Sequence, residues 1–373
     1  MRKGFTTGSC AAAASKAAAM MLLGGTVKNK IEITTPAGIV YSPDIEDITK
    51  GDSYVKCAVR KDSGDDPDIT NGSLVYAKVS YAGDGESSGE KVYIDGGEGV
   101  GVVTRPGLDQ PVGNAAINSV PRMMIRDEVI QVMDFYDFDG SLQVEISVPG
   151  GEEIALKTFN PRLGIEGGIS IIGTTGIVEP MSTKALLDTI RVELNQLKEL
   201  GLTVAVISPG NYGLDFMRDT YSYDLDRAVK CSNYIGDTID MAAELGFKKM
   251  LLCGHIGKLI KVSGGIMNTH SKEGDCRMEL MAAAAIRCGA DNKVLAKILD
   301  CVATEEAIEI MVCAGIKEKC FEYITDKISF YLKKRAADRL EIECMVYANA
   351  YGLLGKTQNA DDLMEEAKKE IVG

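Results

Sequence analysis

The chain has 373 residues, enough for two domains with separate cores, and its 45% hydrophobic and 25% charged residues are ordinary for a globular enzyme. A net charge of −13 and a pI near 4.9 argue against a nucleic-acid partner, which would require a clustered basic face. The ten cysteines include no C-x-x-C pair, and no apolar run reaches the ~18 residues that cross a bilayer, so we expect a cytoplasmic protein with reduced thiols and no membrane contact.

The first expected element follows the stretch GFTTGSCAAAA at residues 4–14. A polar turn before the apolar run, and Lys16 within it, argue against a secretion signal. We expect a helix over residues 9–23 with Ser9 as its N-cap. Its free N–H groups and the hydroxyls of Thr6 and Thr7 would suit a carboxylate or phosphate. An ordinary capped helix without a ligand explains the pattern equally well.

Residues 1–158 are expected to form an α+β domain. Runs of β-branched or alternating residues between Gly, Pro and Asp clusters predict strands, and a second helical run spans residues 111–132. Strands of irregular spacing with few helices favour an α+β domain over a βαβ array. The strands are expected at residues 30–35, 54–60, 74–81, 91–94 and 142–148.

Residues 159–373 are expected to form a Rossmann-like α/β domain with C-terminal helices. A strand, a glycine turn and a helix follow one another three times, which is typical of a parallel sheet with crossover helices. The strands are expected at residues 168–172, 202–207 and 249–253, and the helices at 181–200, 235–245 and 274–288. From residue 291 onward the pattern is mostly helical, with a late strand at 342–348 and a charged surface helix at 361–369.

Three glycine turns mark the expected ligand edge, because ligands of parallel sheets lie outside the carboxyl ends of the strands. They are GTTG at 173–176, SPGNYG at 208–213 and GHIGK at 254–258. We favour nucleotide binding at GTTG over a plain βα loop, although it is not a G-x-G-x-x-G fingerprint. GHIGK lacks P-loop spacing, and GGEGVGVV at 96–103 fails the dinucleotide spacing.

The segment KDSGDDPDITNG at 61–72 places four aspartates around a proline. Asn71 and Ala77 stand where a calcium loop would need glycine and glutamate, so an acidic solvated turn is the simplest interpretation. The two histidines, His255 and His270, are too far apart for helical metal spacing, and no metal site is expected. Both lie near the expected ligand edge, where a polar contact to substrate is a credible alternative to a satisfied polar residue.

Arg105 and Arg122, with Arg126 just beyond, stand out in an acidic chain. A solvated face is one interpretation. A basic pocket for carboxylates is the other, because guanidinium binds carboxylate in bidentate fashion.

Together these stretches resemble the cobalt-precorrin-5B C(1)-methyltransferases, the CbiD family. The resemblance runs in order from residue 2 to about 290, with Ser9 and Asn71 where the family pattern would have Thr and His. It is carried by RKGFTTGSCAAAASKAA, KDSGDDPDITNG, VGVVTRPGLD, NPRLGIEGGISIIGTTGIVEPMS and GHIGK.

The resemblance implies methylation of carbon 1 of cobalt-precorrin-5B by S-adenosylmethionine, giving cobalt-precorrin-6A in anaerobic cobalamin biosynthesis. Cobalt would enter only within the corrinoid substrate, and a homo-oligomer is compatible with the sequence. We expect the first domain to contribute corrinoid binding and the second to bind the methyl donor. Methyl transfer needs alignment and exclusion of water more than a strong acid or base, and Asp65 or Asp66 is the candidate for proton balance or for orienting basic residues.

The candidate residues therefore fall into two binding groups. The donor is expected to contact Gly173, Thr174, Thr175, Gly176, Gly210, Asn211, Gly254, His255 and Gly257. The corrinoid is expected to contact Thr6, Thr7, Gly8, Ser9, Arg105, Arg122, Lys258 and His270. Two alternatives of other classes stay open: a nucleotide-dependent oxidoreductase or kinase, and a non-catalytic corrinoid-binding protein.

Overall fold

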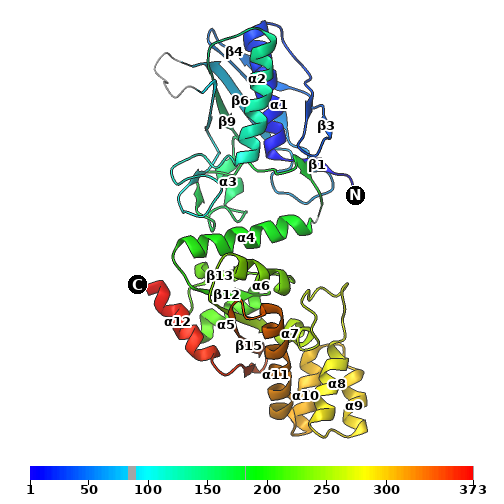
Figure 1. Cartoon of the computed structure of the whole chain (residues 1–373). Coiled ribbons are helices and arrows are strands. Elements are labelled where there is room, and N and C mark those ends of the chain that lie inside the picture. Colours follow the sequence, from blue (N-terminus) through cyan, green and yellow to red (C-terminus); the bar gives the residue numbers. More distant parts are fainter. Residues whose placement is uncertain (83–89, 181, 373) are drawn as a thin grey trace. The chain divides into compact units, whose positions relative to one another are not determined.

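A computed structural model describes residues 1–82, 90–180 and 182–372, which form two compact units, Met1–Ser182 and Thr183–Gly373 (Figure 1). The boundary follows Ser182, not residue 158 as the sequence suggested. Two short antiparallel pairs explain the difference, because they return residues 160–180 to the first unit. β10 (Ile165–Glu166) pairs with β8 (Val102–Val103), and β11 (Ile177–Val178) pairs with β1 (Gly4–Phe5).

The first unit is built on a five-stranded sheet of order β4-β5-β6-β9-β7. All neighbours are antiparallel except β7 and β9, which run parallel. The strands are β4 (Glu46–Lys50), β5 (Tyr54–Arg60), β6 (Leu74–Tyr81), β7 (Val92–Gly96) and β9 (Leu142–Ser147), with β2 (Ile33–Thr34) and β3 (Val40–Tyr41) as a separate hairpin. Alternating apolar residues therefore located four of these five strands. They missed β4, and the strand expected at 30–35 is only the two-residue β2.

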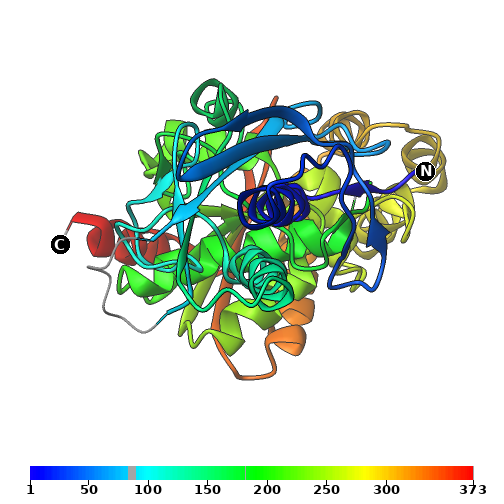
Figure 2. The same ribbon diagram turned by 90° about the horizontal axis from the view of Figure 1, so that it is seen from above.

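Two helices lie side by side against one face of this sheet, α1 (Thr7–Gly24) and α2 (Ser119–Phe135) (Figures 1 and 2). The alanines of α1 are buried around the whole helix, and such small side chains let it approach both α2 and the sheet. Residues 111–118, expected to be helical, form turns instead. Pro121 is tolerated in the first turn of α2 because that N–H would have no helical partner. A short helix, α3 (Gly151–Ala155), follows β9.

The second unit holds a five-stranded sheet of order β13-β12-β14-β15-β16. The first four strands are parallel, and β16 is antiparallel to β15. The strands are β12 (Val204–Ser208), β13 (Ala228–Lys230), β14 (Lys249–His255), β15 (Glu341–Ala348) and β16 (Gly352–Lys356).

Helices cover both faces of the second sheet, so its strands read as continuous apolar runs. One face packs against α4 (Thr183–Glu199), α6 (Ile235–Glu244), α7 (Ile256–Val262) and α11 (Lys317–Ala336), and the other against α5 (Asn211–Tyr221) and α12 (Ala360–Val372). Further helices α8 (Arg277–Arg287), α9 (Asn292–Leu299) and α10 (Thr304–Cys313), with the 3-10 turn Leu225–Arg227, complete the unit.

The mixed α/β class is confirmed, but one expected strand was wrong. Residues 168–172 do not join the parallel sheet; in the first unit they make only isolated bridges, Val100 to Ile169 and Ile117 to Ile171. The helix expected over 181–200 is α4, and the expected first residue, Met181, lies outside the described residues.

Candidate functional site

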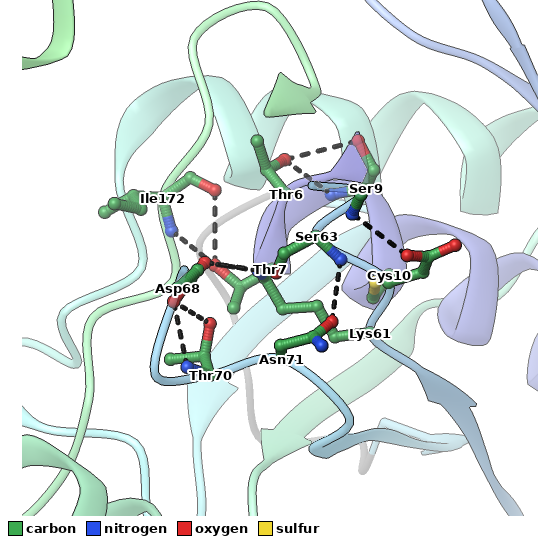
Figure 3. Close-up of polar contacts among 12 residues, drawn as sticks. Thr6, Thr7, Ser9, Cys10, Lys61, Ser63, Asp68, Thr70, Asn71 and Ile172 are labelled. Carbon is green, nitrogen blue, oxygen red and sulfur yellow. Dashed lines mark hydrogen bonds and ion pairs between the residues drawn. The ribbon is translucent and has the colours of Figure 1, made fainter. Parts of the chain in front are cut away.

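Three segments that are distant in the sequence meet in the first unit, at the start of α1. We call them the N-terminal cluster: residues 2–9, 61–71 and 172–176 (Figure 3). Phe5 N–H donates to the Asp62 carbonyl at 2.8 Å, and Gly8 N–H donates to the Ile172 carbonyl at 3.0 Å. The threonine- and serine-bearing turn at residues 4–9, the aspartate loop at residues 61–72 and GTTG are therefore parts of one site.

The N-cap of α1 is Thr6, three residues before the expected Ser9. Thr6 Oγ1 accepts from Ser9 N–H at 3.2 Å, while Ser9 Oγ donates to the Gly176 carbonyl at 2.7 Å. Thr7 Oγ1 accepts from Ile172 N–H at 3.0 Å. Thr7 is 3% exposed and Ser9 is fully buried. A substrate carboxylate would have to displace these bonds, so the structure favours a structural role for residues 6–9.

GTTG belongs to the first unit and does not follow a strand of the parallel sheet, so that premise of the donor-site prediction is wrong. Gly173 and Gly176 have φ of +143° and +78°, values that favour glycine. A Cβ at Gly176 would lie 2.8 Å from Ser9 Oγ, and one at Gly173 would collide with Thr6. Thr175 bonds the backbone of Ile177, whereas Thr174 is exposed. The glycines therefore serve close packing; a donor contact here stays a prediction.

The aspartate loop is organised by cations, not solvated throughout. Lys61 is 2% exposed, and its Nζ lies 2.5 Å from both Ser63 Oγ and Asp68 Oδ2. Burial would raise the pKa of Asp68, but the Lys61 ammonium and the Thr70 hydrogen bonds hold it below the usual value. This pairing fits the expectation that the loop orients basic groups.

The outer part of the same loop binds the N-terminal strand. The Arg2 guanidinium, with the Gly64 N–H, lowers the pKa of Asp62 to about 2. Asp65 accepts from Arg2 N–H at 2.5 Å and is exposed, and Asp66 donates its own N–H to the Ser63 carbonyl. A catalytic role for Asp65 or Asp66 stays a prediction.

Arg122 connects three backbone segments of the first unit through hydrogen bonds. Its Nε, Nη1 and Nη2 donate to the carbonyls of Ile117, Ile94 and Ala115 at 2.8, 2.8 and 3.3 Å. Burial lowers the pKa of the Arg122 guanidinium. Three of its five donors are therefore occupied by backbone carbonyls, and a contact of Arg122 with a substrate carboxylate stays a prediction.

Arg105 is freer than Arg122. It donates to the Arg162 carbonyl at 3.1 Å and packs over Gly164. Because one hydrogen bond to the described residues leaves most of its donors available, Arg105 is the better candidate for a substrate carboxylate.

The strand order of the second unit reverses between the parallel strands β12 and β14, because the chain adds β13 on one side of β12 and β14 on the other. Ligands of open α/β sheets bind at such a point. Gly210 caps α5 after β12, with extended backbone and no atom within 4 Å of an added Cβ, and Asn211 begins the helix. Across the same point, Lys258 Nζ donates to the Pro209 carbonyl at 2.6 Å and to the Ser232 carbonyl at 3.3 Å. Burial lowers the pKa of Lys258. The Lys258 ammonium therefore lies between the two turns where the methyl donor was expected to bind.

His255 is held by a hydrogen bond at Nδ1, whereas its Nε2 has no hydrogen-bond partner among the described residues. Its Nδ1 accepts from Gly257 N–H at 3.1 Å, and its Nε2 lies 2.9 Å from Glu305 Oε1 on α10. Because Nδ1 accepts, the neutral ring carries its proton on Nε2, and the bond at Nδ1 orients the turn. Gly254 is packed under Leu259, and His270 is exposed, with Nδ1 accepting from Lys272 N–H.

Several buried charged residues escaped the sequence reasoning: Lys61 and Glu128 in the first unit, and Glu193, Lys261 and Glu343 in the second. Nothing local marks Lys61 as buried. Glu128 was detectable, because it falls on the stripe of α2 that also carries the buried Met124, Val129 and Val132. Within the described ranges no cluster of three or more His, Cys, Asp or Glu side chains is arranged to bind a metal, and no helix has the length and apolarity to span a bilayer.

Comparison with known proteins gives two family matches. Residues 1–180 match the model described as CbiD, and residues 268–358 match the CbiD C-terminal domain. The first match ends close to the end of the first compact unit, Ser182.

Several curated relatives carry the name cobalt-precorrin-5B C(1)-methyltransferase. The protein of Ruminiclostridium cellulolyticum is 45% identical, with 99% of this chain and 96% of the relative covered. That of Thermoanaerobacter sp. is 47% identical, with 95% of each covered. A crystal structure of a cobalamin biosynthesis protein (cbiD) from Archaeoglobus fulgidus is 29% identical, covering 76% of this chain and 84% of the other, with a TM-score of 0.39.

Proposed function

Because the chain belongs to the CbiD family, we propose that it methylates carbon 1 of cobalt-precorrin-5B, giving cobalt-precorrin-6A in anaerobic cobalamin biosynthesis. The observation that carries this proposal is the identity of 45–47% to relatives of that name, over nearly the full length of both chains. We further propose S-adenosylmethionine as the methyl donor, which supplies a methyl group on a positively charged sulfur.

The residues of the chain have to position two ligands of opposite charge. The corrinoid carries acetate and propionate groups, so basic side chains with free donors suit it. Arg105 meets that requirement in the first unit, and Lys258 brings a positive charge to the sheet edge of the second. The strand order of the second unit supports a Rossmann-like arrangement. We place the reaction in the cytoplasm, in keeping with ten cysteines that are all free thiols.

A labelling experiment tests the activity. The purified protein is incubated without oxygen with cobalt-precorrin-5B and S-adenosylmethionine carrying a ¹³C methyl group. The expected product carries the label at carbon 1, and S-adenosylhomocysteine forms in equal amount. A corrinoid that stays bound and unlabelled would instead support a binding protein, and label at another carbon would contradict the proposed position.

A further inference from the structure

A cavity of about 330 Å³ lies within the first unit, beside α1 and α2. Small-molecule sites commonly span ~300–1,000 Å³, so it has room for a ligand fragment of amino-acid size or somewhat larger. None of its lining residues was among the expected site residues. The lining comprises Lys16 of α1, residues 32–36, and Met123, Met124, Asp127, Glu128 and Gln131 of α2.

The cavity contains an ion pair, Lys16 with Glu128, that can still form further hydrogen bonds. Glu128 is 8% exposed, and its Oε2 lies 2.7 Å from Lys16 Nζ. Within the described part of the chain Glu128 Oε2 is paired with the Lys16 ammonium but has no hydrogen-bond partner. Lys16 Nζ also donates to the Glu32 carbonyl at 2.9 Å. The Lys16 ammonium offsets part of the cost of burying this carboxylate, and a ligand that donates a hydrogen bond to it would offset more.

The charges of the lining favour a cation. Glu32, Asp127 and Glu128 carry three negative charges against the single positive charge of Lys16. Among the described residues these carboxylates form no metal-binding cluster. A polycarboxylate such as the corrinoid would be repelled. Met123 and Met124 add polarisable apolar surface for the uncharged parts of such a ligand.

We propose that this cavity, and not the sheet edge spanned by Lys258, binds the methionine end of S-adenosylmethionine. That end carries a sulfonium, an ammonium and a carboxylate, and so has a net charge of +1. Asp127 and Glu128 supply the negative charge for its two cationic groups, and the remaining N–H of Lys16 suits its carboxylate. The inference rests on the proposed function. It assigns the cationic methyl donor to the acidic cavity and leaves the basic side chains to the polycarboxylate corrinoid.

The position of the cavity agrees with a role beside the N-terminal cluster. Thr35 lines the cavity, and a Cβ on Gly176 would lie 2.7 Å from Thr35 Cβ. Ala37 N–H also donates to the Thr175 carbonyl at 3.0 Å. The wall of the cavity is therefore fixed by GTTG, which gives that motif a supporting role in donor binding.

Calorimetry with S-adenosylmethionine and S-adenosylhomocysteine tests the proposal, because the second ligand lacks the sulfonium charge. Asp127→Asn and Glu128→Gln should weaken binding of S-adenosylmethionine about five- to tenfold, and that of S-adenosylhomocysteine less. Asp134→Asn, the same charge change on an exposed position of α2 outside the cavity, should leave both affinities unchanged.

Gly210→Val tests the alternative site at the sheet edge. Gly210 has extended backbone and open space around an added Cβ, so valine should fit there and occupy space that a donor bound at the edge would need. If Gly210→Val abolishes binding while Asp127→Asn and Glu128→Gln bind like the wild type, the donor sits at the sheet edge and the cavity proposal is wrong. Asp127 is exposed, so its variant is informative even if Glu128→Gln does not fold. If the wild type binds neither ligand, the proposed methyl transfer itself is contradicted.

Discussion

Ser9 donates its hydroxyl to the Gly176 carbonyl across 167 residues of sequence. The bond is 2.7 Å long, Ser9 is fully buried, and the same carbonyl also accepts from Thr6 N–H at 3.1 Å. The first turn of α1 and the GTTG turn therefore form one packed unit, and substitutions in either should first affect stability.

Gly176→Ala should destabilise the first unit by more than backbone strain alone. Gly176 has φ +78°, and its added Cβ would meet Thr35 and Ser9 at 2.7 and 2.8 Å. Gly38→Ala is the matched control, with φ +74° and open space around the Cβ. The control should lose about 1 kcal/mol of unfolding free energy, and Gly176→Ala clearly more, as measured by urea unfolding. Equal losses would mean that the neighbours give way and the close contact is unimportant.

Local sequence patterns located the elements whose formation depends mainly on side-chain periodicity and helix propensity. Alternation of apolar residues gave β5 and β6 at their observed bounds, and the alanine run gave α1. The run at 168–172 was misassigned because a short apolar segment fits a buried strand or an irregular buried segment equally well. Its true neighbours, Thr7 and Ala116, are far away in the sequence. The cavity was missed for the same reason, since Lys16 and Glu128 meet only through tertiary packing.

Arg122→Ala should lower the free energy of unfolding, because three backbone carbonyls lose their donor. The expected loss is about 1–3 kcal/mol. Arg122→Lys should recover little of it, since one ammonium cannot reach three carbonyls in the directions of a guanidinium. Arg105→Ala, which removes one such bond, should cost less stability but weaken corrinoid binding. Loss of corrinoid affinity in Arg122→Ala at full stability would instead support Arg122 as part of a basic pocket for substrate carboxylates.

Asp68→Asn should destabilise the protein at neutral pH and change its acid unfolding. Because the folded-state pKa of Asp68 is lowered, its contribution is present above the unfolded pKa near 4 and is lost as pH falls through the folded value. Removing one partner of the Lys61 pair should cost about 3 kcal/mol at pH 7. The difference from wild type should shrink below pH ~4. Asp52→Asn, at an exposed position, is the control. A difference independent of pH would exclude an ionised Asp68 as the cause.

Lys258→Met should test whether the ammonium at the sheet edge holds the turns together. Lys258 donates to the Pro209 and Ser232 carbonyls, so its removal should cost about 1–2 kcal/mol of unfolding free energy at pH 7. Lys297→Met, at an exposed position of α9, should cost almost nothing.

The pH dependence of the same variant carries the sharper information. Burial lowers the folded-state pKa of Lys258, so above that pKa the unfolded chain binds more protons than the folded one. The stability of the wild type relative to Lys258→Met should therefore rise with pH between the folded value and the unfolded value near 10.4. Urea unfolding at several alkaline pH values measures this difference. If the difference is flat, the ammonium is not desolvated, and the sheet edge is open enough to admit a ligand beside Lys258. If it rises, the charge is fixed between the two turns, where it disfavours a cationic methyl donor.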